Sequence, residues 1–127
     1  MIVRSVSEIQ GTDRDVRGDG WHAQRLLIRD DGLGFSLSET TVDAGAQMSL
    51  WYRHHYEACF CIEGEAEITE RDTGVVHRIG PGSVYSPEHD RHEIRVISAL
   101  RLVCVFNPAL TGHEKHDSDG SYPPPSD

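Results

Sequence analysis

The chain has 127 residues, the size of one domain that can bury about two thirds of its unfolded surface in a single core. Twelve Lys and Arg residues against 21 Asp and Glu residues give a formal net charge of -9 at pH 7. The negative charges are scattered, which predicts an acidic, solvated surface and argues against a nucleic-acid or anionic-membrane partner.

The N-terminal region predicts one helical turn, near Val6 to Ile9, with Ser5 or Ser7 as its cap. The first residues lack the basic and apolar regions of a signal peptide, and no run approaches the roughly 18 apolar residues of a membrane span. We therefore expect a cytoplasmic protein with no membrane partner.

Short β-type runs separated by Gly, Pro, Asn and Asp dominate the rest of the chain. Many strands at such intervals are typical of an all-β sandwich or barrel rather than of alternating βα units. No internal repeat or linker divides the chain, so residues 1–127 are predicted to form one domain. The predicted strands are RLLIR (25–29), ACFCI (58–62), AEIT (66–69), VVHRI (75–79), EIRVI (93–97) and RLVCVF (101–106).

The C-terminal segment differs in composition from the strands. From about residue 112 onward the sequence is polar and contains three consecutive prolines. This composition predicts a partly mobile arm. Because a polar arm beside an open barrel mouth can exclude water on closing, we expect it to order over the cavity when substrate binds.

Strand alternation assigns the chemically active side chains to faces. Glu57 has the parity of Cys59, which places its carboxyl group at the mouth of a buried strand. His92 has the parity of Ile94 and is predicted to point toward the core. Of the two histidines in HDRH, His92 is therefore the better ligand candidate, and His89 is the better turn residue.

The three cysteines, Cys59, Cys61 and Cys104, lie in apolar strand-like runs. An odd number of such cysteines predicts reduced, buried thiols. Cys-x-Cys pairs occur in metal sites, but no second Cys or His pair lies at the spacing of a zinc site.

The spacing of several residues resembles the cupin superfamily. Gly45, Glu57 and Gly64 fall at the positions of the first cupin motif, but Trp51 and Arg53 stand where its two metal-binding histidines are expected. The second motif is kept at Gly74, Gly80 and Gly82, with Tyr85 in place of the third histidine. The resemblance implies a single-domain, cupin-type β-barrel (jelly roll) whose metal site has different ligands.

Glu57, Tyr85 and His92 are the candidate metal ligands. A carboxylate, a phenol and an imidazole from three strand regions suit Fe(II), Mn(II) or Zn(II), with positions left open for substrate. From the residues alone, an equal alternative is a strand-end charge, a rim aromatic and a core histidine.

Six segments in the same order resemble the ectoine synthase family, over Met1 to about Pro123. The resemblance implies a hydro-lyase that cyclises N4-acetyl-L-2,4-diaminobutyrate to ectoine with loss of water, and a homodimer that pairs through exposed barrel edges. It implies the same three ligand positions and favours Fe(II), which would act as a Lewis acid. The segments are RDDGLGFS (29–36), WYRHHYEA (51–58), CIEGE (61–65), HDRH (89–92), RLVCVFNPALTG (101–112) and HDSDG (116–120).

The resemblance also implies the site residues. Arg25 is expected to pair with the substrate carboxylate, and Trp21 or Phe106 to shield its methylene and ammonium groups. Tyr52 differs in parity from Glu57, so it reaches the same cavity only if residues 53–56 bulge. His55 has the parity of Glu57 and is a candidate from the residues themselves, beside Tyr52 or in its place. The catalytic candidates are thus Glu57, Tyr85 and His55, and the substrate-binding candidates are Trp21, Arg25, Thr40, Tyr52, Phe106, Glu114 and His116.

A second hypothesis is a non-catalytic cupin that binds a small ligand, or a cupin isomerase that uses the same barrel. The fold alone excludes neither, because function depends on the site. The HDRH and CVFNPALTG segments favour the synthase, since a generic cupin does not need them.

Overall fold

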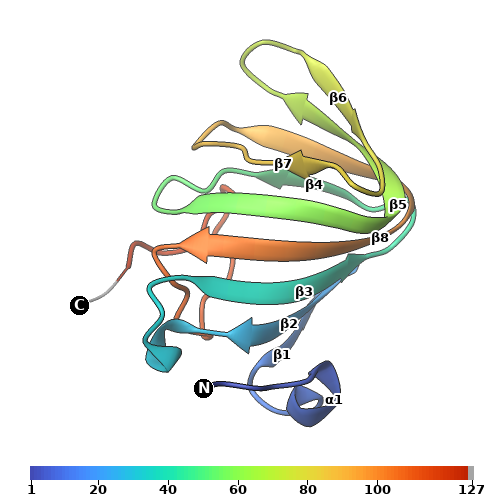
Figure 1. The fold of residues 1–127 in the computed structure, drawn as a ribbon. Helices are drawn as coiled ribbons and strands as arrows, with labels where there is room; N and C mark the ends of the chain where they lie inside the picture. The colour runs from blue at the N-terminus through green and yellow to red at the C-terminus, as the bar shows by residue number, and fades with distance from the viewer. Residues whose placement is uncertain (126–127) are drawn as a thin grey trace.

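Strands β5 (Tyr56–Glu70) and β8 (His92–Asn107) form the centre of the fold in the computed structural model, which describes residues 1–125. They pair in antiparallel fashion along almost their whole length, from Tyr56 opposite Asn107 to Glu70 opposite His92. Both strands bend in the middle (Figure 1), so the two ends of each strand return to the same side of the molecule.

The bend depends on a glycine. The β5–β8 register shifts between Cys61 and Ala66, and Gly64 within this stretch has a φ of 88°. A Cβ atom at Gly64 would lie 2.1 Å from the carbonyl oxygen of Ala99, so both the conformation and the close approach require glycine. This second glycine of the cupin motif therefore shapes the barrel.

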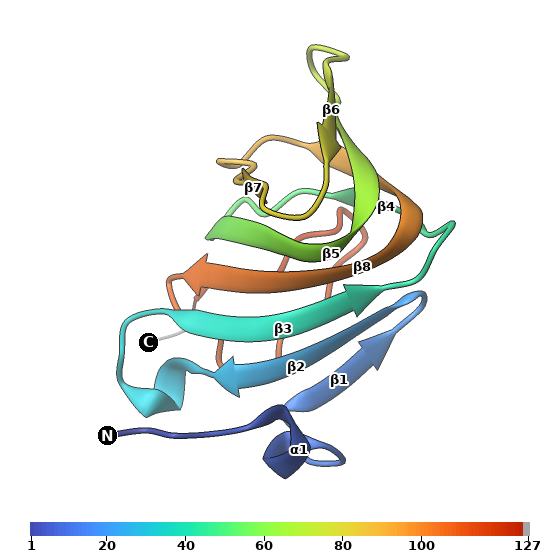
Figure 2. The ribbon, with the colours of Figure 1, turned by 45° about the vertical axis from the view of Figure 1, so that its right-hand side comes forward.

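The other strands extend this central pair. Within residues 1–125, eight strands form one sheet in the order β1-β2-β3-β8-β5-β6, while β4 pairs with β8 and β7 pairs with β5. The sheet curls around an interior (Figure 2). The remaining elements are α1 (Val6–Ile9), β1 (Asp15–Gly18), β2 (Trp21–Leu27), η1 (Arg29–Asp31), β3 (Ser36–Val42), β4 (Gln47–Leu50), β6 (Val76–Ile79) and β7 (Val84–Tyr85).

The structure confirms the all-β barrel and the helical turn at Val6–Ile9, where Ser5 occupies the cap position. Several predicted boundaries were wrong. Residues 58–62 and 66–69 belong to one strand, as do 93–97 and 101–106, because bulges carry the pairing through the bend. The strand predicted at 25–29 lies at Trp21–Leu27 instead.

Four strands were not predicted at all: β1, β3, β4 and β7. Strand β3 reads SLSETTV, and β1 reads DVRG, so neither has an apolar run. They are strands because they pair with β2 and β8, a tertiary condition that outweighs local composition.

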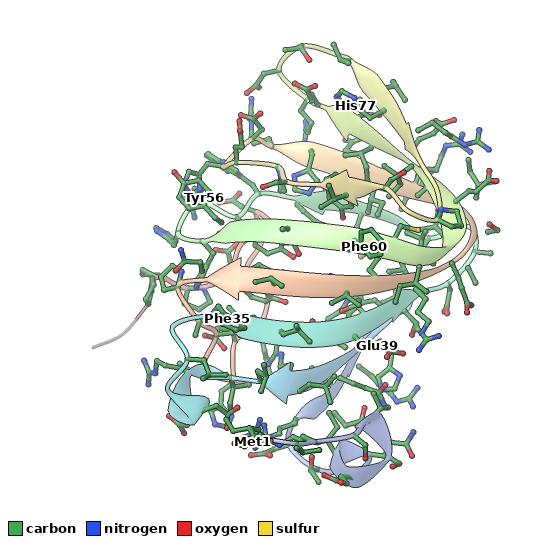
Figure 3. All side chains as sticks on the ribbon, in the orientation of Figure 1. Met1, Phe35, Glu39, Tyr56, Phe60 and His77 are labelled. Atoms are coloured by element: carbon green, nitrogen blue, oxygen red, sulfur yellow. The ribbon has the colours of Figure 1, made fainter. Side chains whose placement is uncertain are left out.

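The predicted faces of β5 and β8 are correct. Glu57 and Cys59 point into the barrel and are buried, whereas Phe60 points outward and is half exposed. Figure 3 shows Phe60 and Tyr56 on the outer side of β5. The three cysteines are free and buried, as predicted.

The segment after β8 returns across the barrel. The backbone N–H of Arg29 donates to the carbonyl oxygen of Leu110 at 2.7 Å, and that of Trp51 donates to Gly120 at 3.1 Å. A Cβ atom at Gly120, whose φ is 72°, would lie 2.2 Å from the carbonyl oxygen of Ser49. This contact fixes the segment to β4. The last two residues of the predicted arm, 126 and 127, lie outside the described residues.

Candidate active site

A mostly apolar cavity lies inside the barrel, between the strands and the C-terminal segment. Its wall includes eight of the residues predicted for the site. They come from β2, β3, β5, β7 and β8, from the irregular residues 51–55, and from the C-terminal segment: Trp21, Arg25, Thr40, Tyr52, Glu57, Tyr85, Phe106 and His116.

Three predicted site residues are not on this wall. His92 lines a neighbouring groove bounded by β5, β6 and β7, and Tyr85 lines both the groove and the cavity. His55 is buried behind the wall, and the carboxylate of Glu114 is bound within its own turn. The structure therefore brings Glu57 and Tyr85 to one cavity, and Tyr85 and His92 to the neighbouring groove.

Glu57 and Tyr85 are held in a low-dielectric environment. Burial raises the pKa of the Glu57 carboxyl group to about 7, and burial raises the pKa of the Tyr85 phenol well above its usual value. Oε1 of Glu57 is buried and has no hydrogen-bond partner within residues 1–125. A buried carboxylate oxygen without a partner is unfavourable unless a ligand, an ion or a proton satisfies it.

His92 is oriented by its own main chain. Its Nδ1 lies 3.0 Å from the carbonyl oxygen of Asp90, which can only accept a hydrogen bond, so Nδ1 carries the proton. Burial lowers the pKa of this imidazole and keeps it neutral. Nε2 is then an unprotonated lone pair, buried and without a partner in the described chain. This is the arrangement of a metal-binding histidine.

Tyr52 reaches the cavity without the predicted bulge. Residues 51–55 form no strand, so strand parity does not apply to them. The Tyr52 hydroxyl lies 2.8 Å from Nε2 of His116, and its ring packs edge-on against Phe106. Burial raises the pKa of Tyr52, while burial and the neighbouring Arg25 lower the pKa of His116 to about 4. The phenol therefore donates to a neutral imidazole.

Arg25 places a buried positive charge in the cavity wall. Its side chain is 3% exposed, and its guanidinium donates to the carbonyl oxygens of Gly112 at 2.6 Å and Glu114 at 3.2 Å. No Asp or Glu side chain of residues 1–125 forms an ion pair with it. The charge is thus solvated by backbone carbonyls and remains available to an anion.

Glu114 stabilises the turn at residues 111–114 that supplies both of these carbonyls. Its carboxylate accepts from the backbone N–H of Thr111 at 2.8 Å, from the Thr111 hydroxyl at 2.9 Å and from the N–H of Gly112 at 3.0 Å. Burial raises its pKa, but these hydrogen bonds outweigh burial and the net effect is a lowered pKa. Glu114 therefore contributes its main chain to the Arg25 site rather than its side chain to the cavity.

His55 lies outside the cavity, next to two aromatic residues that line it. It is 1% exposed, and its ring packs edge-on against Phe106 and Tyr122. Burial lowers its pKa, and neither ring nitrogen has a partner within the described residues. The neutral imidazole supports the position of Phe106.

The two residues at the former histidine positions of the cupin motif lie near the surface. The indole N–H of Trp51 donates to the carbonyl oxygen of His89 at 2.8 Å, and the guanidinium of Arg53 lies 4.8 Å from the Trp51 ring centre. Arg53 also forms ion pairs with Asp117 and Asp119 of the C-terminal segment, at 3.6 and 3.5 Å. These residues attach the segment to the barrel. His89 has a φ of 106°, consistent with its predicted place in a turn.

Ser38 and Tyr122 are two of the cavity residues that were not predicted as site residues. Ser38 lies two residues from Thr40 on the inner face of β3, and their hydroxyl oxygens are 3.3 Å apart. Because Ser38 has the same strand parity as Thr40, the sequence could have indicated that it faces the cavity. Tyr122 stacks on His116 with ring centres 4.4 Å apart, but it follows a polar loop without periodicity, so no sequence signal indicated its inward position.

The donor set fits a divalent metal ion. Glu57 and His92 each present a buried atom without a partner in the described chain. Tyr85 lines both the cavity that Glu57 lines and the groove that His92 lines. A carboxylate, a phenol and an imidazole together suit Fe(II), Mn(II) or Zn(II).

Comparisons with known proteins agree with this geometry. A sequence model of the ectoine synthase family matches residues 1–126. The L-ectoine synthase of Desulfosudis oleivorans is 51% identical over 124 residues, which is 96% of each chain. The crystal structure of ectoine synthase from P. lautus superposes with a TM-score of 0.87 at 45% identity, covering 94% of this chain and 87% of that one.

More distant structures share the fold alone. An RmlC-like cupin from Shewanella frigidimarina has a TM-score of 0.59 at 22% identity, covering 75% of this chain and 82% of that one. In the described residues, no helix is long and apolar enough to cross a membrane. From the match along nearly its whole length, together with the cavity that carries Arg25, Tyr52, Glu57 and Tyr85, the chain belongs to the ectoine synthase family of cupins.

Proposed function

We propose that this chain is a hydro-lyase that closes N4-acetyl-L-2,4-diaminobutyrate into the cyclic amidine ectoine and releases one water. Membership of the family and the names of its relatives support this reaction. The observation that carries the proposal is a mostly apolar cavity with a buried cation, Arg25, and a buried carboxyl group, Glu57, on its wall. A zwitterionic substrate with an apolar linker matches such a cavity.

Arg25 binds the substrate carboxylate. A guanidinium removed from water and paired only with neutral carbonyls gains most from an anionic partner. Trp21 and Phe106 line the same cavity and exclude water from the methylene groups between the two amines. This fixes the chain of the substrate so that its free amine lies near its own acetamide carbon.

Ring closure moves two protons. The free amine attacks the acetamide carbon, the carbonyl oxygen leaves as water, and a C–N double bond remains. Tyr52 and His116 provide a phenol and a neutral imidazole joined by a hydrogen bond on the cavity wall. They can take up the two protons that the amine nitrogen loses, one at a time, and pass them to the carbonyl oxygen, which leaves as water. The low-dielectric wall also limits competing hydrolysis of the acetamide.

Glu57, Tyr85 and His92 hold the metal, for which we propose Fe(II). When bound, a divalent ion supplies Lewis-acid polarisation of the acetamide carbonyl. Support comes from the unprotonated Nε2 of His92 and the unpaired Oε1 of Glu57. His55 does not contact the substrate. Its ring packs against Phe106, which lines the cavity, so its proposed role is to position Phe106.

The assembly is a homodimer in the cytoplasm. Phe60 of β5 and Val84 of β7 are register partners, and both are exposed on the outer face, as is Tyr56. An exposed apolar patch of this kind favours association. Three reduced thiols fit a reducing compartment. Analytical ultracentrifugation that detects only monomer at micromolar concentration would contradict the dimer.

Proton NMR of the purified, iron-loaded protein with N4-acetyl-L-2,4-diaminobutyrate tests the reaction. Appearance of the ectoine ring signals, with loss of the substrate signals, is the expected result. Line broadening of the substrate without product would instead support the non-catalytic binding protein.

A further inference from the structure

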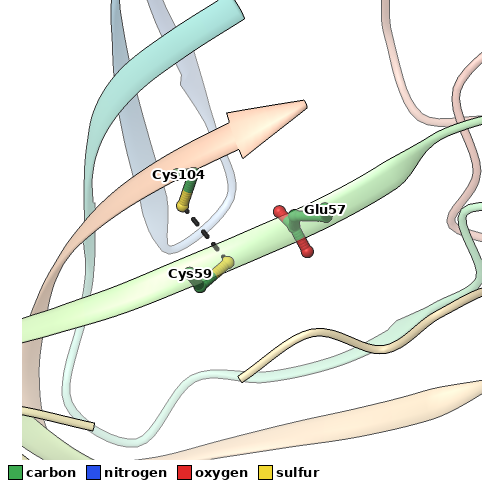
Figure 4. Close-up of side chains that lie close together, drawn as sticks. All are labelled: Glu57, Cys59 and Cys104. Carbon is green, nitrogen blue, oxygen red and sulfur yellow. Dashed lines mark hydrogen bonds between the residues drawn. The ribbon is translucent and has the colours of Figure 1, made fainter. Parts of the chain in front are cut away.

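Two thiols and a carboxyl group converge inside the barrel. Cys59 of β5 and Cys104 of β8 are register partners, and their Sγ atoms are 3.4 Å apart. Glu57 follows the same inner face of β5, beside Cys59 (Figure 4). One ligand atom from each of the three residues lies within 4.8 Å of the other two, and all three side chains are buried.

All three residues line the cavity, so an ion that enters the cavity can reach them. The carboxylate is available, because Oε1 of Glu57 has no hydrogen-bond partner in the described chain and only 7% of the residue is exposed. No spacing in the sequence indicates this grouping, since Cys59 and Cys104 are 45 positions apart.

We propose that Glu57, Cys59 and Cys104 form a second metal site, selective for a soft divalent ion such as Zn(II) or Cd(II). Thiolates prefer soft ions, whereas the carboxylate, phenol and imidazole of Glu57, Tyr85 and His92 suit Fe(II). Each thiol gives up its proton on binding, and one coordination position remains for water.

The observed sulfur spacing suits this site. Two sulfurs about 2.3 Å from a tetrahedral Zn(II) are about 3.7 Å apart. The Sγ atoms of Cys59 and Cys104 already lie 3.4 Å apart, so the metal needs only a small widening of the pair. The antiparallel pairing of β5 and β8 fixes both Cα positions, which makes the site largely preformed.

Glu57 belongs to both ligand sets, so the two metals compete for its carboxylate. A soft ion in the thiol site would therefore remove a ligand from the iron site and inhibit the enzyme. This consequence depends on the proposed function, but binding of the soft ion does not.

Cobalt(II) titration of the metal-free, reduced protein tests the site directly, because thiolate ligands produce an ultraviolet charge-transfer band that oxygen and nitrogen ligands do not. We expect the band in the wild type. It should weaken in Cys59→Ser and in Cys104→Ser and vanish in the double variant, and Zn(II) affinity should fall by more than about tenfold in each single variant.

Cys61→Ser is the matched control, because Cys61 lies on the same strand and is buried, but its Sγ contacts the carbonyl oxygen of Glu63 at 3.3 Å and is not on the cavity wall. It should keep the band. His92→Ala should also keep the band while it loses iron, which separates failure of this site from failure of the iron site.

Cadmium NMR of the wild type gives a result that needs no variant, since the cadmium shift reports the number of sulfur ligands. A shift typical of two thiolates is expected. A shift without sulfur ligands, or a Cys59→Ser/Cys104→Ser double variant that binds Zn(II) as tightly as the wild type, would overturn the proposal.

Discussion

The strands and the C-terminal segment form two walls around the cavity and its neighbouring groove, and these walls differ in how their polar groups are satisfied. On the strand side, Oε1 of Glu57 and Nε2 of His92 are buried without partners in the described chain. On the side of the C-terminal segment, His116 is paired with Tyr52, and the carboxylate of Glu114 accepts three hydrogen bonds. The polar groups of the strand wall lack partners until a ligand or ion binds, whereas those of the C-terminal segment are hydrogen-bonded within the protein.

This difference separates two tasks. An unpaired buried polar group costs about 1–3 kcal/mol, so the strand wall gains most when a ligand or ion fills it. The C-terminal segment gains little from a ligand and acts as a cover that positions Arg25 through main-chain carbonyls. Substitutions of Glu57 and His92 should therefore affect chemistry, and those in the segment, apart from the proton-transfer residue His116, should affect binding and stability.

The largest effect is expected from the ligand variants Glu57→Ala and His92→Ala. Each should lose bound metal and activity together, with metal affinity reduced by more than about 100-fold, because each removes a direct ligand. Metal analysis, turnover and circular dichroism on the same samples measure this.

The matched control is Glu93→Gln, an exposed neighbour of His92 on β8. It should shift the free energy of unfolding by about 0.5 kcal/mol or less and keep its metal. Full metal content and turnover in both Glu57→Ala and His92→Ala would show that the metal lies elsewhere.

Next in size is Arg25→Met, which keeps the length of the side chain and removes its charge. Loss of a charge-assisted contact of about 1.5–3 kcal/mol should weaken substrate binding by about 10- to 150-fold. Calorimetric titration with substrate measures it. Arg95→Gln, which removes a cation from the exposed pair with Glu67, should bind normally. Unchanged affinity in Arg25→Met would assign the carboxylate to another residue.

The C-terminal segment should confer a pH dependence through His116. Burial and Arg25 lower its folded pKa to about 4 from 6.5, so between these values the unfolded chain binds more protons. The free energy of unfolding should therefore decrease as the pH falls through this window, by about 3 kcal/mol. Urea denaturation at a series of pH values measures the free energy of unfolding of the wild type and of His116→Gln. The variant should show the weaker dependence on pH. Parallel profiles would mean that His116 does not titrate in this range.

The smallest effect belongs to Arg53→Gln. Its ion pairs with Asp117 and Asp119 are solvent-exposed and should contribute about 0.2–1 kcal/mol. Hydrogen exchange at Ser121 and Tyr122 should become faster, while metal content stays unchanged. A loss of metal in this variant would mean that the cover and the strand wall are coupled.

The sequence by itself determined the features that depend on local backbone period and on motif spacing. Strand pleating alternates side chains at every second residue, so the inward direction of Glu57 and Cys59 and of His92 and Ile94 followed directly. The cupin spacing identified Gly64, whose positive φ and contact with the Ala99 carbonyl only glycine permits. The metal role of Glu57, Tyr85 and His92 stays a prediction.

Only the tertiary structure decided the features that depend on long-range register. Pairing of β5 with β8 places Cys59 against Cys104, and the absence of a strand at residues 51–55 lets Tyr52 enter the cavity despite its parity. Packing of the irregular C-terminal segment brought Tyr122 inward and bound the carboxylate of Glu114 in its turn. Local composition cannot encode these contacts, because each depends on which distant segment lies opposite, and the register of the folded sheet alone fixes that.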